Sequence, residues 1–200
     1  MSEPKRIPRQ KRAIETKMQI VETAIGLFAE KGYHHTSSNE IAKQAGVAIG
    51  SFYSYFQDKK QVFLEALDHY DRRIREGMET DVRVNAAGKE KILHELIHNT
   101  IQAHKIFPGF QREIEAMRIL DADVGTAFHD LEKREIRHIR ELLEIWKDEL
   151  RVKELETVAT VLYHIVEKIV HVIMFSNPEE ITEKKLVQAL TDMILRYLFA

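Results

Sequence analysis

The sequence lacks cysteine and contains few residues that interrupt helices, with four prolines and eight glycines in 200 residues. A chain without cysteine has no disulfide and no thiolate zinc site, which suits a reducing compartment. No apolar run approaches the roughly 18 residues that a membrane span requires, and no apolar signal region marks the N-terminus for export. We therefore expect a cytoplasmic protein with no membrane partner.

Strand-like alternation of apolar and polar residues is also scarce, whereas apolar residues recur at the spacing of helices. Hydrophobic residues make up 44% of the chain, which is enough for a proper core. We predict an all-α protein of about nine helices. Their approximate ranges are 14–31, 38–45, 49–56, 58–78, 89–105, 110–120, 126–151, 155–175 and 182–199. We predict that Gly32 and Gly46 end the first two helices, that Asn177-Pro178 ends the eighth, and that Thr182 caps the ninth.

Charge is distributed unevenly along the chain, although the net charge is only −2. Residues 1–60 carry ten Lys and Arg against six acids, a net charge of +4, and residues 61–200 carry −6. The first twelve residues, MSEPKRIPRQKR, show no periodicity and read as a flexible basic arm. A basic N-terminal third favours contact with a polyanion. We expect two functional domains, 1–60 and 61–200, fused through the 58–78 helix.

Two capping boxes and one tight turn organise the N-terminal third. Ser37 and Glu40 have the spacing of a capping box, and so do Asp58 and Gln61. Between them, two short helices meet at Ala45-Gly46-Val47. Two short helices joined by a tight turn are typical of a helix-turn-helix, whose second helix enters the major groove with its N-terminal residues on base edges.

The second short helix has one face for the protein and one for DNA. Phe52 and Phe56 are expected to hold it to its own core, and small residues near its start allow a close approach to the bases. Hydroxyl and ammonium groups can donate to phosphates, as can the N–H groups at the 37–40 helix start. The expected outer residues are Ala48, Ile49, Gly50, Ser51, Ser54 and Tyr55, and the expected phosphate donors are Tyr53, Ser54, Tyr55 and Lys59.

The stretch GYHHTSSNEIAKQAGVAIGSFYSYFQDKKQVF resembles the DNA-binding signature of the tetracycline-repressor (TetR) family. That pattern has a T-S-x-x-x-I-A-x-x-A-G-V block, then G-[ST]-x-Y-x-[YH]-F, then a lysine that starts the next helix. The similarity covers about residues 13–75 without a gap, and the remaining 125 residues match only in style. The resemblance implies a homodimeric transcription repressor that a ligand releases from a palindromic operator in double-stranded DNA.

Carried over by position, the resemblance implies two sets of DNA contacts. Ile49 stands where a polar residue would be convenient for reading a base, so we expect it to read a thymine methyl or no base. The residues that look groove-facing are Ser38, Asn39, Ala48, Gly50 and Ser51, and those that resemble phosphate contacts are Thr36, Ser37, Tyr53, Ser54, Tyr55 and Lys59.

The segment HELIHNTIQAH matches the H-E-x-x-H motif of zinc proteases at His94, Glu95 and His98. Zinc proteases of the extended motif need a glycine before the third histidine, and Ile101 stands there inside a continuous helix. On an unbroken helix His104 points about 120° away from His98. We therefore interpret the motif as a coincidence on an ordinary helix and expect no catalytic residue, metal or cofactor.

The segment 89–175 carries aromatic and methionine side chains that can line an apolar cavity with a few polar groups. Such linings suit a small hydrophobic effector. The alternative is that these residues only pack the core. The candidate ligand-binding residues are His104, Phe107, Phe110, Glu113, Met117, Phe128, Trp146, Tyr163, His171, Met174 and Phe175.

The last two predicted helices are too apolar to face solvent on all sides. Two such helices from each of two chains can form a four-helix dimer interface, and the alternative is a larger monomer core. The candidate interface residues are Val158, Leu162, Ile165, Ile169, Val172, Leu186, Leu190, Met193 and Tyr197.

The prediction is therefore a ligand-responsive, homodimeric DNA-binding regulator. Two rival functions remain open at this point. One is a zinc-dependent hydrolase built on the HELIH motif, which stoichiometric zinc surviving dialysis would favour. The other is an architectural DNA-binding dimer without a ligand, which a lack of effectors would favour.

Overall fold

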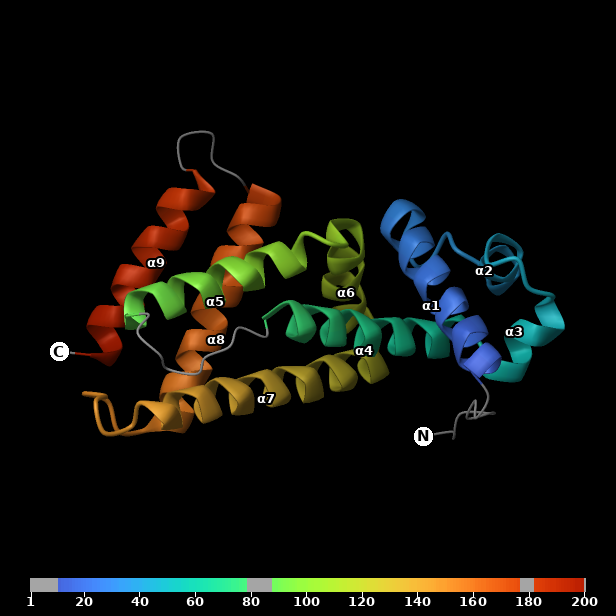
Figure 1. The fold of residues 1–200 in the computed structure, drawn as a ribbon. Helices are drawn as coiled ribbons and strands as arrows, with labels where there is room; N and C mark the ends of the chain where they lie inside the picture. Colours follow the sequence, from blue (N-terminus) through green and yellow to red (C-terminus); the bar gives the residue numbers. More distant parts are fainter. Residues whose placement is uncertain (1–10, 79–87, 177–181, 200) are drawn as a thin grey trace. The chain divides into compact units, whose positions relative to one another are not determined.

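The structure is a computed structural model that describes residues 11–78, 88–176 and 182–199. Within these ranges the chain forms α-helices and one short π-helix and contains no strand, so the all-α prediction is confirmed (Figure 1). Residues 1–10 of the predicted basic arm lie outside the described ranges, as does the predicted helix terminator Asn177-Pro178. Lys11 and Arg12, the end of that arm, already belong to the first helix.

The chain packs into two compact units. The head unit comprises Met1–Arg72 and Phe107–Phe128, and the body unit comprises Arg73–Ile106 and His129–Ala200. The division falls inside α4 (Lys59–Met78), inside α7 (Ala122–Ile145), and between α5 (Lys89–His104) and α6 (Pro108–Leu120). These are units of packing, and the functional division into 1–60 and 61–200 stays a prediction.

The head unit begins with α1 (Lys11–Lys31), α2 (Ser38–Gln44) and α3 (Ile49–Tyr55). Gly32, after α1, has φ +83°, and Gly46, after α2, has φ +67°. A side chain is strained in this left-handed region, so glycine is the residue that ends helices there. Both helix stops that we predicted at these glycines are confirmed.

Aromatic rings form the centre of the head unit. Phe63 of α4 lies 5.3 Å from the ring of Phe28 in α1 and 5.3 Å from the ring of Phe110 in α6, centroid to centroid. Tyr33 and Tyr70 extend this head aromatic cluster, at 5.3 Å from Phe63 and 5.8 Å from Phe110. Ring pairs at such separations stabilise a fold beyond the area that they bury. The cluster fastens α6 to the N-terminal helices.

Helix α6 starts at Pro108, two residues before the predicted start at residue 110. Proline is favoured at the first helical position because its missing N–H leaves no donor unsatisfied there. The next residue, Gly109, lies against α1 so closely that a Cβ would stand 2.5 Å from the carbonyl oxygen of Ala29. A glycine at this position is what permits the close packing of α6 on α1.

The body unit contains α5, the part of α7 from His129 onward, α8 (Leu155–His171), the π-helix (Val172–Ser176) and α9 (Glu183–Leu198). Helix α5 packs against both α8 and α9 (Figure 1). Thr182 caps α9 as predicted, since its side chain accepts the N–H of Lys185. The buried core is aliphatic around one tryptophan: Ile92, Leu93, Ile97, Ile101, Leu143, Trp146, Val158, Ala159, Leu162, Val170, Val187, Leu190, Ile194 and Leu198.

Helix α7 covers residues 122–145, so the predicted range of 126–151 is wrong at both ends. The Oδ1 atom of Asp121 accepts the N–H groups of Asp123 at 3.0 Å and Val124 at 3.2 Å, which caps the helix four residues early. After the helix, the chain turns so that Trp146 is buried and its ring lies 5.9 Å from that of Phe199. Burial of the tryptophan thus ends the helix earlier than its polar pattern indicated.

The segment Leu155–Ser176 is long and apolar enough by composition to cross a membrane, with a mean hydropathy of 1.6. Glu167 and Lys168 interrupt it, so it is no uninterrupted apolar run. Only 22% of its most apolar window is buried within this chain. An apolar helix that its own chain leaves largely uncovered needs another surface to cover it.

Candidate DNA-binding site

The start of α3 is an exposed helix end held by buried rings. Phe52 and Phe56 are almost fully buried, as predicted, and fasten α3 to the head unit. The turn Ala45-Gly46-Val47 is closed by the N–H of Val47, which donates to the carbonyl oxygen of Ala42 at 3.0 Å. This geometry is that of a helix-turn-helix, in which the first helix braces the second.

Most of the predicted DNA contacts lie on the surface of this motif. Ser54 is partly exposed and turns its hydroxyl back to the carbonyl oxygen of Ser51 at 2.7 Å. Ile49 is 39% exposed and Tyr53 is 42% exposed, so both can reach a partner. The exposed candidates are Ser37, Asn39, Ala48, Ile49, Gly50, Ser51 and Tyr53, and the partly exposed ones are Ser38, Ser54 and Lys59.

Two predicted phosphate contacts are not on the surface: the prediction that Tyr55 lies on the outer side is wrong, and a phosphate contact by Thr36 stays a prediction. Tyr55 is only 7% exposed, because it shares the inward side of α3 with Phe52 and Phe56. Thr36 is 3% exposed, and its hydroxyl donates to the carbonyl oxygen of Gly32 at 2.9 Å. Both side chains stabilise the head unit from inside.

The ammonium group of Lys59 is hydrogen-bonded to the turn between α1 and α2. Its Nζ atom donates to the carbonyl oxygens of Tyr33 and Thr36, the latter at 2.6 Å, and lies 4.2 Å from the centroid of the Tyr33 ring. Burial lowers the pKa of the Lys59 ammonium group. The expectation that this ammonium is free for a phosphate is therefore wrong for this conformation, and a phosphate contact by Lys59 stays a prediction.

Both predicted N-caps are present, although the side chain of Gln61 accepts the N–H of Gln57 at 2.6 Å rather than that of Asp58. Ser37 caps α2, since its Oγ atom accepts the N–H of Glu40 at 3.2 Å. The hydrogen bond from Lys31 is the main cause that lowers the pKa of Glu40, and the backbone of Ser37 also lowers it. Asp58 likewise accepts the N–H of Gln61 at 2.8 Å. These caps hold the starts of α2 and α4 in place beside α3.

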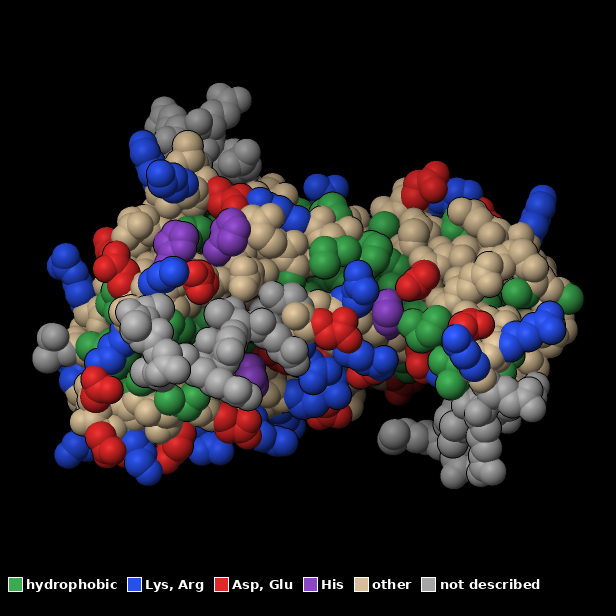
Figure 2. Space-filling view, in the orientation of Figure 1, with side chains coloured by type: hydrophobic (Ala, Val, Ile, Leu, Met, Phe, Trp, Pro, Cys, Tyr) green, Lys and Arg blue, Asp and Glu red, His purple; other side chains and the backbone are tan. Residues whose placement is uncertain are grey.

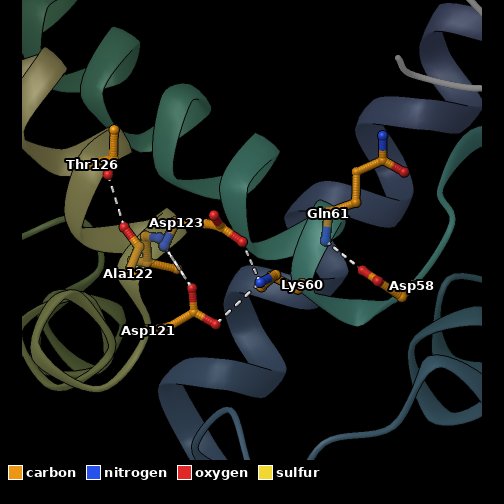
Figure 3. A network of polar contacts seen from close by, with 8 residues as sticks. Asp58, Lys60, Gln61, Asp121, Ala122, Asp123 and Thr126 are labelled. Atoms are coloured by element: carbon orange, nitrogen blue, oxygen red, sulfur yellow. Dashed lines mark hydrogen bonds and ion pairs between the residues drawn. The ribbon is translucent and has the colours of Figure 1, made fainter. Parts of the chain in front are cut away.

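Figure 3 shows how the start of α4 is tied to the start of α7 inside the head unit. The Nζ atom of Lys60 pairs with Asp121 at 3.3 Å and with Asp123. The hydrogen bonds to the two carboxylates raise the pKa of Lys60. Burial works to raise the pKa of Asp121, but the N–H of Val124 and the Lys60 ammonium outweigh it, so this pKa is lowered.

The predicted ligand-binding residues fall into two separate groups. Phe110 and Met117 are buried in the head unit, where Phe110 belongs to the aromatic cluster, and Glu113 accepts the N–H of Tyr33. Helix α6, which carries these residues, packs on α1 within the head unit, and a cavity that they share with the others stays a prediction. The head group is Phe107, Phe110, Glu113, Met117 and Phe128, and the body group is His104, Trp146, Tyr163, His171, Met174 and Phe175.

The HELIH motif has the geometry of an ordinary helix face. The rings of His94 and His98 lie 6.4 Å apart and nearly parallel, and Figure 2 shows two neighbouring histidine side chains on the surface over α5. His104 is 5% exposed, with its Nδ1 atom 2.8 Å from the carbonyl oxygen of Thr100. Among the described residues no group of three or more His, Asp or Glu side chains could hold a metal ion.

Two side chains contain a buried polar atom, and only one of the two, His171, was a candidate from the sequence. The Oε1 atom of Gln111, in the head unit, and the Nδ1 atom of His171, in the body unit, are buried without a hydrogen-bond partner among the described residues. His171 was a candidate from its residue type alone, and Gln111 was missed because glutamine on a helix is usually exposed. Buried polar groups of this kind normally have a partner.

The predicted dimer residues divide between core and surface. Val158, Leu162 and Leu190 are buried in the body core, so their assignment to an interface is wrong for this chain. Ile165, Ile169, Val172 and Leu186 are partly exposed, whereas Met193 is 44% and Tyr197 is 42% exposed. Val161, next to the predicted Leu162 on α8, is 39% exposed. The two helices are where the periodicity predicted them, but part of the predicted outward stripe has the wrong register.

Comparisons with known protein families agree with this reading. Residues 20–66 match the family model described as bacterial regulatory proteins of the tetR family. Residues 90–198, more than half of the chain, match the tetracyclin repressor-like C-terminal domain. The two matches cover the helix-turn-helix and nearly all of the helices that follow α4.

A related sequence and two solved structures illustrate the similarity. The fatty acid metabolism regulator protein of Bacillus subtilis is 40% identical over 75 residues, which span 38% of this chain and 39% of that relative. The fatty acid degradation regulator FadR from Bacillus halodurans has a TM-score of 0.72 at 18% identity, covering 94% of this chain and 97% of its own. A transcriptional regulator from Saccharomonospora viridis in complex with choline has a TM-score of 0.74 at 18% identity, covering 94% and 99%.

Proposed function

Because the chain belongs to the TetR family of bacterial transcriptional regulators, we propose that it is a homodimeric repressor that a small molecule releases from a palindromic operator. The observation that carries the proposal is the exposed start of α3. Ala48, Gly50 and Ser51 present almost no side-chain bulk there, while Phe52 and Phe56 fix the helix from behind. A rigid helix end with small side chains can lie close to base edges in the major groove.

The dimer is supported by the apolar surface that the body unit leaves uncovered. Val161 and Ile165 on α8 and Met193 and Tyr197 on α9 are at least partly exposed. Exposed apolar side chains that recur on a helix face in this way are typical of an interaction site. A second copy of the chain is the partner that fits a two-fold operator, because an isologous interface uses the same patch on both copies.

The effector site is proposed to lie in the body unit. His104, Tyr163, His171, Met174 and Phe175 remain from the predicted set once the head residues and the core residue Trp146 are removed. His171, with a buried Nδ1 atom that lacks a hydrogen-bond partner within the described part of the chain, lies next to the π-helix, and π-helices are frequent at functional sites. An apolar compound with one hydrogen-bonding end, such as a fatty acid derivative, suits these groups, and one Bacillus relative and one Bacillus structural neighbour are named for fatty acid metabolism and fatty acid degradation.

The proposed mechanism is a shift between two conformations of the dimer. A ligand that prefers the conformation in which the two heads are wrongly spaced will reduce operator affinity. Helix α4 belongs to the head unit up to Arg72 and to the body unit beyond it, so it is the proposed lever. Coupling of about 1–3 kcal/mol, or roughly 5–150-fold in affinity, is the usual scale for such effects.

The test is selection of bound duplexes from a random DNA pool by the full-length protein. We expect a pseudo-palindrome whose half-site centres lie about 34–36 Å apart, or a multiple of that distance. Affinity for the selected duplex should fall as salt rises, because phosphate contacts release counterions. Recovery of no enriched sequence, or of sequences without two-fold symmetry, would contradict the proposed function.

A further inference from the structure

The backbone of Tyr33 is held on both sides by charged side chains. Its N–H donates to the Oε2 atom of Glu113 at 2.7 Å, and its carbonyl oxygen accepts from the Nζ atom of Lys59. Glu113 comes from α6 and Lys59 from the start of α4, 80 and 26 residues away along the chain. Hydrogen bonds with one charged partner are about twice as strong as neutral ones.

The held residue lies in the turn that leads directly into α2. The turn continues with the N–H of Thr36, which donates to the carbonyl oxygen of Tyr33 at 3.3 Å, and then reaches Ser37, the N-cap of α2. The Tyr33 ring also packs against Phe28 and Phe63, at 5.6 and 5.3 Å. A displacement of this turn would therefore move α2, and with it the bracing of α3.

The Glu113 carboxylate is itself fixed. Gly109 and Phe110, on the same helix, hold α6 against α1 through the close approach to Ala29 and through the aromatic cluster. A Cβ added at Gly32 would lie 3.3 Å from the Oε1 atom of Glu113, so the carboxylate also occupies the space beside the glycine. The Glu113 carboxylate is thus held by a helix that is packed firmly against α1.

We propose that Glu113 is a positioning residue for DNA binding: its carboxylate fixes the turn before α2 and thereby sets the place of the helix-turn-helix. This role rests on the proposed operator binding and replaces the ligand contact that residue type alone had indicated. The function of Glu113 is local to the head unit. It needs no contact with DNA, since its carboxylate points to a backbone N–H of its own chain.

The experiment compares Glu113→Ala with Glu113→Gln, whose amide oxygen can still accept the N–H of Tyr33. Glu115→Ala is the matched control, because Glu115 stands two residues away on α6 and pairs only locally with Arg118 at 2.9 Å. For each full-length variant, affinity for the selected operator is measured at several salt concentrations. Thermal unfolding and hydrogen exchange at the Tyr33 amide are measured on the same samples.

We expect Glu113→Ala to bind the operator about tenfold more weakly, the factor that corresponds to loss of one charge-assisted hydrogen bond. The salt dependence should stay unchanged because no phosphate contact is removed. The Tyr33 amide should exchange faster. Glu113→Gln should retain most of the affinity, and Glu115→Ala should equal the wild type.

A folded Glu113→Ala protein with wild-type operator affinity would overturn the inference while leaving the proposed function intact. If that variant does not fold, Glu113→Asp, which keeps the charge and withdraws the acceptor by one methylene, takes its place with the same criterion. A wild-type protein that binds no duplex would overturn both the proposed function and this inference.

Discussion

The head and body units are built from different side chains. Rings of Phe28, Phe63 and Phe110 contact one another at the centre of the head, whereas the body core is aliphatic around Trp146. Rings pack in few orientations, and aliphatic cores tolerate repacking if volume is kept. The head is therefore suited to present one fixed shape to DNA, and the body is suited to adjust around a ligand and a second copy.

The largest expected effect tests whether Phe110 belongs to the head core or to a ligand site. Phe110→Ala should lower the free energy of unfolding by about 3–5 kcal/mol, because it empties the middle of the aromatic cluster. Trp146→Ala, which truncates the other buried aromatic once predicted to line the cavity, is the counterpart in the body. Urea unfolding followed by circular dichroism measures both losses.

The two variants should differ in the urea concentration at which they lose operator binding. Phe110→Ala should lose operator binding at urea concentrations where Trp146→Ala still binds, since only the former lies in the unit that carries α3. If both variants lose operator binding at the same fraction unfolded, damage to the head core and damage to the body core affect DNA binding equally.

The next effect in size concerns the outward stripe of the body. Met193→Glu with Val161→Glu should convert the proposed dimer to a monomer, because two charges per chain would be buried at the interface. Operator affinity should fall by about 100-fold or more, which corresponds to about 2.7 kcal/mol, since one head alone keeps half of the contacts. Analytical ultracentrifugation and operator titration report the two quantities.

A matched control changes the charge by two units on the opposite side of α9. Lys184 is exposed and lies about 180° around the helix from Met193. Lys184→Glu should leave both sedimentation and operator affinity as in the wild type. Dimers that persist in the Val161→Glu, Met193→Glu protein would place the interface elsewhere.

Alanine substitutions at two glycines of the head unit should change the stability by smaller amounts and in opposite directions. Gly109→Ala should destabilise the protein by about 1–3 kcal/mol, because the new methyl group meets the carbonyl oxygen of Ala29. Gly26→Ala, on α1 with nothing within 4 Å of the added Cβ, should stabilise it by roughly 0.5–1 kcal/mol through helix propensity. Melting temperatures of the two variants should therefore shift in opposite directions, and a shared direction would remove the argument for close α1–α6 packing.

Local signals in the sequence predicted the helix-turn-helix of the head, but they did not predict which helices pack against one another. Ser37, Asp58, Gly32 and Gly46 act within a few residues of themselves, so their caps and stops are readable from spacing. Helical periodicity shows which residues share a face but not which partner that face meets. Met117 was therefore assigned to a cavity although α6 packs in the head.

The same limit explains the errors at the site. Tyr55 lies one helical position from the partly exposed Ser54, and Leu162 lies one position from the exposed Val161; an apolar or aromatic residue fits either side. Lys59 was predicted to donate to a phosphate because nothing local shows that two carbonyl oxygens converge on its ammonium group. Contacts that depend on three separate segments carry no signature in any one of them.

The smallest expected effect is an acid dependence of the stability of the head unit. The folded state lowers the pKa of Asp121 below its ordinary value of about 3.8, because the N–H groups of Val124 and Asp123 and the Lys60 ammonium outweigh burial. Protonation of a group with a lowered pKa is linked to unfolding, so its stabilisation is present above pH 4 and is lost as the pH falls through the folded-state pKa. Asp121→Asn should therefore be less stable than the wild type at pH 6, and the difference should shrink toward pH 3. Asp130→Asn, which removes an exposed carboxylate 3.9 Å from the Nζ atom of Lys133, is the control and should show no comparable difference at pH 6. Urea titrations at pH 6, 4 and 3 measure this, and a stability gap for Asp121→Asn that stays constant down to pH 3 would mean that the link between α4 and α7 does not depend on the Asp121 charge.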